Sequence, residues 1–393
     1  MHEPFAHPMM ARATHDELAR QNFVSSFKIY MEDDVYPENE AVYRKRAEPR
    51  FVREHNRPPA NRHEVRRALE TEAFTQTWSS IARTLQEMMW DASGETVERQ
   101  LPELIAKAKV RNPRGSLRLD PNLKVPKYNA AIDIHCMPGG YATELCEDDV
   151  FSGALVDRGG YYYALPLQGK AAHAFRDTAE NSYRGAAARN VIRYLHREFP
   201  SLAPRRILDM GCGIGGGTLP YVDAYPDAKV YGIDLGGPQV RYGHARAEGL
   251  GKTVHFSQQN AERTNFPDGH FDLIVSHGLA HETSTKAIRL IMAEVSRLLA
   301  AGGVTVHSDP QMGRGLTPHD SFMHDWDTHN NNEPFWGTLH DIGVADLMTG
   351  AGFAPDSVHD VWARYGDDDG PSIIAADDVT SSLARTSIFG AQK

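Results

Sequence analysis

The sequence predicts an α/β protein in which a mainly helical N-terminal domain precedes a doubly wound, mostly parallel sheet. From residue 181 onward, short apolar runs alternate regularly with helical segments. Because parallel strands are joined by crossover helices, this alternation indicates one sheet that is covered on both faces. Residues 14–110 look mostly helical instead. We therefore expect two domains, over residues 1–180 and 181–393.

The composition narrows the class of protein. The chain has 393 residues, a formal net charge of −10 and 41% hydrophobic residues, which is ordinary for a globular enzyme with a large core. The acidic balance argues against nucleic acid as a partner, since phosphate binding favours a basic surface. Three cysteines, Cys136, Cys146 and Cys212, fit neither a zinc ribbon nor a disulfide framework.

Targeting signals are absent from the sequence pattern. The N-terminus lacks a basic stretch followed by an apolar one, so we expect no signal peptide. No apolar run approaches the roughly 18–20 residues that span a bilayer. A cytoplasmic protein without a membrane partner is the expectation that follows.

Good helix formers predict three helices in the N-terminal domain, over 61–70, 79–90 and 98–110. A connector rich in proline and glycine follows over 112–126. Two apolar runs, 130–141 and 151–167, then predict extended segments. These segments form either a wall over an active site or a small subdomain. The whole domain is expected to be a lid, an acceptor-binding element, a homodimer interface or a combination of these.

The second domain contains the alternating elements. We expect strands over 206–210, 229–234, 253–258, 271–276, 303–307, 357–364 and 387–391. We expect helices over 186–198, from about 218, and over 238–248, 284–299 and 339–349. A solvated turn is expected over 366–371. Sites in sheets of this type collect where the strands end, so the residues after each strand are the candidates for function.

The first strand of this sheet ends in a glycine-rich turn, within residues 207–217. Gly211, Gly213 and Gly216 fit the pattern G-x-G-x-x-G, which brings backbone N–H groups and a helix N-terminus against a ligand. Alone, this pattern fits a nicotinamide-dependent oxidoreductase equally well. However, Asp209 would repel a pyrophosphate, whereas it favours the sulfonium and ammonium cations of S-adenosylmethionine.

Two further polar positions follow at the expected spacing. Asp234 ends the next strand and can accept hydrogen bonds from two ribose hydroxyls. Residues 259–262 follow the third strand, and their polar side chains and backbone groups can form hydrogen bonds with the edge of an adenine. With the fourth strand at 271–274, these elements resemble a class I S-adenosylmethionine-dependent methyltransferase, of the broad group that includes the ubiquinone and menaquinone enzymes. The similarity extends from about Tyr183 to the C-terminus.

The resemblance implies a seven-stranded Rossmann-like sheet, S-adenosylmethionine as the cofactor and S-adenosylhomocysteine as the product. It also implies a set of cofactor-binding residues: Tyr183, Asp209, Gly211, Cys212, Gly213, Gly215, Asp234, Leu235, Gln239, Asn260, Ala261, Glu262 and His277. Asn260 stands where the family often has aspartate. Tyr183 either closes over the cofactor or is an ordinary aromatic residue at a helix start, and Cys212 is expected to be a packing residue.

Methyl transfer to a hydroxyl needs a general base, most often histidine or a carboxylate. The candidates after the fourth strand are His281, His277 and Glu282, with His277 also expected to line the cofactor. The alternative for His281 is that it caps or packs the following helix. No second histidine completes an H-E-x-x-H motif here, so no metal is expected.

A polar and aromatic stretch over 308–336 follows the fifth strand, where relatives bind their acceptor. We expect acceptor contacts from His324, Trp326, His329 and Trp336. The alternative is a surface lid with scattered histidines. Histidines five residues apart lie about 140° apart on a helix, so they do not form a metal cluster by themselves.

The function expected from the sequence is methylation of a small molecule in secondary or specialised metabolism. In-line displacement onto a hydroxyl, with a histidine base, is the expected mechanism. Carbon, nitrogen and sulfur acceptors remain open. The other classes considered are a nicotinamide oxidoreductase, a cofactor-binding regulatory protein without turnover and an RNA-modifying enzyme.

Overall fold

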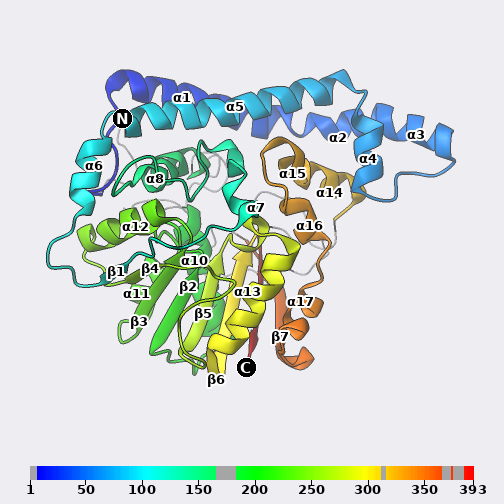
Figure 1. Ribbon diagram of the computed structural model, residues 1–393. Helices are drawn as coiled ribbons and strands as arrows, with labels where there is room; N and C mark the ends of the chain where they lie inside the picture. The colour runs from blue at the N-terminus through cyan, green and yellow to red at the C-terminus, as the bar shows by residue number, and fades with distance from the viewer. Residues whose placement is uncertain (1–6, 165–182, 311–315, 365–372, 375–384) are drawn as a thin grey trace.

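The computed structural model describes residues 7–164, 183–310, 316–364, 373–374 and 385–393. These residues form one large sheet with helices on both faces and a further layer of N-terminal helices over one end of the strands (Figure 1). None of the described helices is long and apolar enough to cross a bilayer.

The sheet has nine strands in the order β1-β4-β3-β2-β5-β6-β9-β7-β8. In chain order they are β1 (Ser116–Arg118), β2 (Arg206–Met210), β3 (Lys229–Asp234), β4 (His255–Gln258), β5 (Phe271–His277), β6 (Leu299–Asp309), β7 (Val358–Arg364), β8 (Ile373–Ile374) and β9 (Arg385–Gln392). The strands from β1 to β6 in this order pair in parallel, and β9, β7 and β8 pair antiparallel. The predicted seven-stranded sheet is therefore present, and the short strands β1 and β8 extend its two edges.

Helices cover both faces of this sheet. Three of them pack on one face: α10 (Tyr183–Glu198), α11 (Leu219–Ala224) and α12 (Gly237–Gly249). Two pack on the other: α13 (Thr285–Leu298) and α17 (Val344–Gly350). The helix expected over 339–349 is two helices, α16 (Trp336–His340) and α17, because a bend ending at Gly343 separates them. The turn expected over 366–371 lies outside the described residues.

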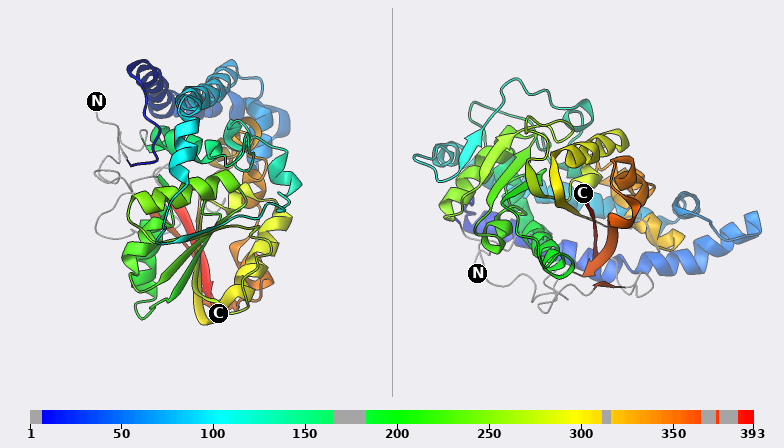
Figure 2. Two further views of the ribbon diagram at one scale, coloured as in Figure 1. Left: turned by 60° about the vertical axis from the view of Figure 1, so that its left-hand side comes forward. Right: turned by 90° about the horizontal axis from the view of Figure 1, so that it is seen from below.

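The N-terminal helices are α1 (His15–Tyr30), α2 (Glu38–Val42), α3 (Glu48–His55), α4 (Arg62–Leu69), α5 (Ala73–Glu98) and α6 (Leu101–Ala108). They include the three predicted helices, and single π-helical turns over 31–35 and 43–47 flank α2. Helices α1 and α5 lie side by side beyond the carboxyl ends of the parallel strands (Figures 1 and 2). Their buried side chains form one cluster with Tyr242 of α12 and Phe322 of α14 (Pro318–His324), so this layer packs directly on the sheet domain.

Both predictions of extended segments in the N-terminal half are wrong. Residues 130–141 contain the end of the short helix α7 (Lys127–Ala130) and a 3₁₀ turn (Ile134–Cys136), and residues 151–164 form helix α8 (Phe151–Ala164). Glycines and aromatic residues suggested a strand over 151–167. In the structure, Gly159 lets α8 lie against α5, because a Cβ there would stand 2.5 Å from the Trp90 ring.

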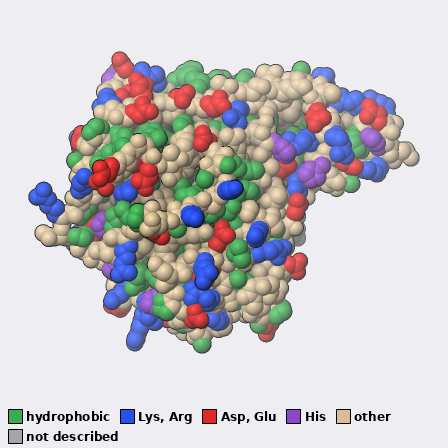
Figure 3. All heavy atoms as spheres, viewed as in Figure 1, with side chains coloured by type: hydrophobic (Ala, Val, Ile, Leu, Met, Phe, Trp, Pro, Cys, Tyr) green, Lys and Arg blue, Asp and Glu red, His purple; other side chains and the backbone are tan. Residues whose placement is uncertain are grey.

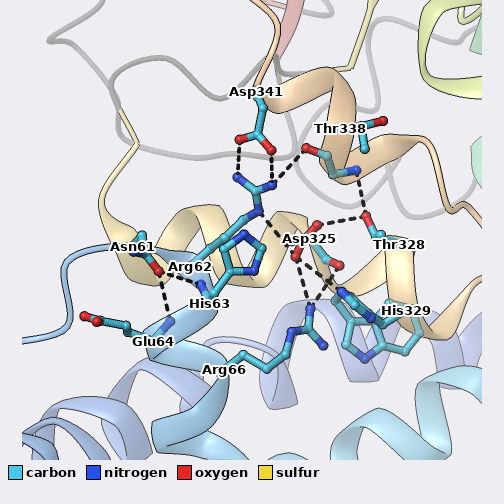
Figure 4. A network of polar contacts seen from close by, with 12 residues as sticks. Asn61, Arg62, His63, Glu64, Arg66, Asp325, Thr328, His329, Thr338 and Asp341 are labelled. Atoms are coloured by element: carbon cyan, nitrogen blue, oxygen red, sulfur yellow. Dashed lines mark hydrogen bonds and ion pairs between the residues drawn. The ribbon is translucent and has the colours of Figure 1, made fainter. Parts of the chain in front are cut away.

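A network of ion pairs joins α4 to α14–α16 (Figure 4). The guanidinium of Arg62 binds both carboxylate oxygens of Asp341 at 2.7 Å. Asp325, which is buried, faces Arg62 at 3.5 Å and Arg66 at 3.2 Å. Over the protruding part that holds α3 and α4, Figure 3 shows Lys, Arg and His side chains close together with Asp and Glu side chains. The network fixes the stretch after β6 against the N-terminal layer.

Candidate functional site

The glycine turn after β2 has the backbone that its sequence predicts. Gly211, Gly213 and Gly215 have φ of 71°, 51° and 77°, in the region that favours glycine. The amides of Gly211 and Cys212 both donate to the carbonyl of Ile233 at 2.9 Å, which ties the turn to β3. A Cβ on Gly211 would lie 2.7 Å from the Leu279 side chain, so only glycine fits between this turn and the loop after β5.

The two predicted acidic residues differ in their surroundings. Asp209 is buried, and its carboxylate accepts a hydrogen bond from the Thr218 hydroxyl at 2.6 Å. Asp234 accepts hydrogen bonds at 2.9 Å from the amides of Gly213 and Gly236. These two amides hold the Asp234 carboxylate at the edge of the pocket described next.

A pocket lies where β2, β3, β4 and β5 end, between the sheet and the N-terminal half of the chain. It is lined by Tyr128, Asn129, Tyr141, Gly211, Gly213, Ile233, Asp234, Leu235, Gln259, Asn260, Ala261, Gly278, Leu279, Glu282, Thr283 and Ile291. Asn260 accepts from the amide of Glu262 at 2.8 Å, which shapes the turn after β4. Glu262 in turn accepts from the hydroxyl of Tyr128 at 3.0 Å, so α7 closes this side of the pocket.

Other residues that the sequence predicts to bind the cofactor do not line the pocket but lie next to it. The amide of Gln239 donates to Ser152 at 3.2 Å, and the His277 ring stacks on Tyr221 with its Nε2 3.2 Å from that hydroxyl. Cys212 is buried against the backbone of Gly232. Tyr183 begins α10, but its side chain lies outside the described part of the structure. The cofactor and catalytic roles predicted for these residues stay predictions.

Glu282 is the centre of a cluster at the pocket wall, which we call the Glu282 cluster: His135, His281, Glu282, Asp309 and Glu333. Oε1 of Glu282 lies 2.9 Å from His135 Nε2 and 3.5 Å from His281 Nε2. The hydroxyl of Tyr141 donates to the same oxygen at 3.0 Å. Two imidazoles and a phenol therefore converge on one carboxylate oxygen.

The other nitrogen of each imidazole also faces a carboxylate. His281 Nδ1 lies 2.6 Å from Asp309, and His135 Nδ1 lies 2.9 Å from Glu333. Asp309 is fixed further, since it accepts from the amides of Ala280 and His281 at 2.9 and 3.1 Å. Both imidazole rings are thus held in defined orientations.

The charges in the Glu282 cluster shift the pKa values of its two histidines and of Glu282. Burial lowers the pKa of His281, but the carboxylates of Glu282 and Asp309 outweigh burial and raise it to about 10. The same balance raises the pKa of His135, where Glu333, Tyr141 and Glu282 oppose burial. Burial raises the pKa of Glu282, yet the two histidines lower it well below its usual range. In the ligand-free protein Glu282 is therefore an ionised carboxylate held between two cations.

His135 is one of the site residues that the sequence analysis missed, as are Tyr128, Tyr141, Asp309 and Glu333. His135 has a left-handed backbone with φ of 56°. Its carbonyl accepts from the indole of Trp90 at 2.6 Å and from the amide of Gln86 at 3.0 Å, both on α5. Its partner Glu282 is 147 positions away. The chain around His135 carries no motif that indicates this contact, because the long helix α5 creates it.

The four predicted acceptor residues have different surroundings. The Trp336 ring lies 4.8 Å from the His281 ring, at the Glu282 cluster, and His324 lies near His340 with 6.5 Å between ring centroids. The Trp326 indole donates to Ser79 at 2.8 Å and packs against α5. His329 is half exposed and lies 3.7 Å from Asp325 in the ion-pair network. The surroundings of Trp336 agree best with an acceptor contact, which stays a prediction for all four.

Comparison with known proteins agrees with this geometry. Residues 207–303 match the family model described as a methyltransferase domain. The chain is 38% identical over 128 residues to ajmaline N-methyltransferase of Rauvolfia serpentina, which is 32% of this chain and 42% of that protein. It is 32% identical over 140 residues to probable chloroplastic tocopherol O-methyltransferase of rice, Oryza sativa subsp. japonica, which is 33% of this chain and 38% of that protein.

A bacterial relative and a solved structure are also similar to this chain. Demethylmenaquinone methyltransferase of Thermus thermophilus is 33% identical over 102 residues, or 26% of this chain and 45% of that protein. The chain thus spans less than half the length of these curated relatives. A geranyl diphosphate methyltransferase in complex with GPP and sinefungin has a TM-score of 0.40 and 18% identity, covering 57% of this chain and 82% of that one.

Proposed function

We propose that this chain, in which residues 207–303 form a class I S-adenosylmethionine-dependent methyltransferase domain, transfers a methyl group from S-adenosylmethionine to a small molecule. The observation that carries the proposal is the pocket at the ends of four parallel strands, where a glycine turn and the fixed carboxylate of Asp234 meet Asn260 and Ala261. The match of residues 207–303 to the methyltransferase family model supports the same conclusion, and the acceptor is a separate proposal.

The residues present fit the cofactor. Gly211 and Gly213 give close access to the backbone, since a Cβ on Gly211 would fill the space next to Leu279. Asp234 offers two carboxylate oxygens at the position that binds a ribose, and Asn260 and Ala261 line the side that would receive the adenine. When bound, the cofactor supplies an electrophilic methyl group on a sulfonium.

The acceptor side is formed by the Glu282 cluster and by aromatic residues from both halves of the chain. Tyr128 and Tyr141 line the pocket, and Trp336 lies against His281. These rings exclude water and hold the acceptor close to the methyl group, which is the main task in an in-line displacement. We propose that the N-terminal 180 residues serve mainly to build this wall.

A hydroxyl is the acceptor group that we propose first. Glu282 lines the pocket, and its Oε2, which His135, His281 and Tyr141 leave open, is the atom placed to accept a hydrogen bond from that hydroxyl. His281, the base predicted from the sequence, faces Asp309 with one ring nitrogen and Glu282 with the other, so it positions Glu282 in this mechanism. The named relatives include both an N- and an O-methyltransferase, so an amine is the second candidate.

Calorimetry on the purified chain tests the proposal. We expect S-adenosylhomocysteine to bind with one site and NAD not to bind measurably. A preference for NAD would overturn the assignment. Incubation with S-adenosylmethionine and a panel of hydroxylated and amine metabolites should then release S-adenosylhomocysteine for one chemical class, and that class identifies the acceptor. Homodimer formation and a cytoplasmic location remain predictions from the sequence.

A further inference from the structure

We infer that His135, His281 and Glu282 form a binding site for one divalent transition-metal ion at the wall of the pocket. Each residue offers one ligand atom, and these three atoms lie within 4.8 Å of one another. Two imidazoles and one carboxylate are a ligand set that binds Zn²⁺, Fe²⁺, Mn²⁺ or Co²⁺ and leaves coordination positions open.

The separations of the ligand atoms suit such an ion. Metal–ligand bonds of about 2.0–2.2 Å at angles between octahedral and tetrahedral values place neighbouring ligands about 2.9–3.5 Å apart. Glu282 Oε1 lies 2.9 Å from His135 Nε2 and 3.5 Å from His281 Nε2. These two distances suit a bound ion, and the remaining pair of ligand atoms lies within 4.8 Å, so rotation of the side chains would bring all three atoms to one ion.

The surrounding carboxylates complete the arrangement. Asp309 and Glu333 each face the Nδ1 atom of one imidazole, at 2.6 and 2.9 Å. A carboxylate at Nδ1 holds the proton there, so an ion that binds at Nε2 displaces only the second proton of each ring, which is the usual second layer of histidine metal sites. Both histidines have this partner although they come from distant parts of the chain.

An unpartnered oxygen points to the same conclusion. Glu282 is 8% exposed, and its Oε2 is buried without a hydrogen-bond partner among the described residues. Its other oxygen, Oε1, by contrast, faces the Nε2 atoms of His135 and His281 and accepts a hydrogen bond from Tyr141. A buried carboxylate oxygen is costly without a partner. A simple ion-pair cluster leaves it unexplained, whereas an ion bound through Oε1 would bring a coordinated water or acceptor oxygen within reach of Oε2.

The role of the ion, unlike its binding, rests on the proposed function. Glu282 and Tyr141 line the pocket, so the open coordination positions face the acceptor. A metal ion there would bind an oxygen of the acceptor and lower the pKa of its hydroxyl. In the metal-loaded protein Glu282 is then a ligand through Oε1, and its Oε2 is the atom that would accept the proton of the bound hydroxyl.

Metal titration of the full chain tests the site without any acceptor. After treatment with a chelator, the protein should bind one equivalent of Zn²⁺ in calorimetry. Co²⁺ should give visible absorption bands typical of nitrogen and oxygen ligands. Glu282→Gln should abolish this binding, and Asp309→Asn should weaken it roughly 10- to 100-fold. His15→Gln is the matched control, because His15 also lies 3.0 Å from a carboxylate, Asp16, but is exposed and has no third ligand.

The outcomes separate the site from the function. Failure of the wild-type protein to bind Zn²⁺ or Co²⁺ stoichiometrically, or equal binding by folded Glu282→Gln, would overturn the metal site. The Co²⁺ spectrum of the wild type decides the question even if a variant does not fold. Binding of S-adenosylhomocysteine, measured without metal, reports on the proposed function alone. Zn²⁺ binding without S-adenosylhomocysteine binding would leave the metal site standing and reject the function.

Discussion

Two aspartates at the ends of neighbouring strands show how surroundings set the role of a residue. Asp209 and Asp234 both look like cofactor ligands in the sequence. Asp209 is buried and accepts a hydrogen bond from Thr218, so it stabilises the start of α11. Asp234 lines the pocket while two amides fix its carboxylate. We therefore expect Asp234 to contribute most to cofactor affinity.

Asp234→Ala should weaken binding of S-adenosylhomocysteine. A hydrogen bond to a charged group contributes about 1.5–3 kcal/mol, so loss of even one of the two bonds to the ribose hydroxyls should raise Kd at least roughly 10-fold in calorimetry. Asp272→Ala is the matched control, because Asp272 also accepts two backbone amides, of Arg205 and Arg206, but at the opposite end of the sheet. Equal affinities of the two folded variants would contradict the role given to Asp234.

At the scale of elements, α4 and the helices after β6 depend on each other. These helices are short, and α15 (Trp326–Asn330) has only five residues. Short helices are marginal by themselves and need tertiary contacts. Asp325 provides such contacts from a buried position, whereas Asp341 is largely exposed. The two carboxylates should therefore differ in their contribution to stability.

Asp325→Ala should destabilise the protein by about 3 kcal/mol, because it leaves Arg62 and Arg66 without their buried partner. Asp341→Ala removes an exposed partner of Arg62 and should cost no more than about 1 kcal/mol. Urea unfolding followed by circular dichroism measures both free energies. The idea fails if the Asp325 variant is as stable as the Asp341 variant.

At the scale of the whole molecule, the N-terminal layer and the sheet domain share one site and one core. The pocket takes Tyr128 and Tyr141 from the first half and its glycine turn from the second. Asp157 of α8 joins the same two parts. It lies 2.7 Å from His7 near the N-terminus and accepts from Tyr242 of α12 at 2.6 Å.

Asp157 makes stability depend on pH in the acid range. Burial by itself raises the pKa of Asp157. The opposing effects of His7, Arg246 and Tyr242 outweigh burial, so the pKa falls from 3.8 to about 2. The folded state thus holds the proton less tightly than the unfolded state, so the stabilisation is present above pH 3.8 and is lost as pH falls through about 2. The shift corresponds to about 2 kcal/mol.

The free energy of unfolding should therefore fall as the pH is lowered across this window, and Asp157→Asn should make that fall smaller. Denaturant titrations at several pH values measure the slope. Asp346→Asn, at an exposed position, is the control and should keep the slope of the wild type. An unchanged slope in Asp157→Asn would show that this carboxylate does not link the two parts.

The sequence by itself determined the parts that depend on local pattern. Alternating strands and helices, the glycine turn after Asp209 and the acid at Asp234 are encoded within a few residues each, through periodicity and backbone sterics. These patterns predicted the sheet and its strand boundaries within a few residues, and they predicted the methyltransferase resemblance that the family model supports for residues 207–303. They also singled out Glu282, which follows a strand end and lines the pocket.

Only the tertiary structure decided the parts that depend on distant segments meeting. Helix α8 resembles a strand in the sequence, because the sequence does not show that Gly159 serves packing against Trp90 of another helix. Trp90 of α5 holds the carbonyl of His135, and the His135 ring contacts Glu282. Because of this contact, His281, which the sequence predicts to be the base, lies in a cluster with the ligand set of a metal site. Local sequence carries the chemistry of each side chain, whereas long-range packing selects which side chains share a site.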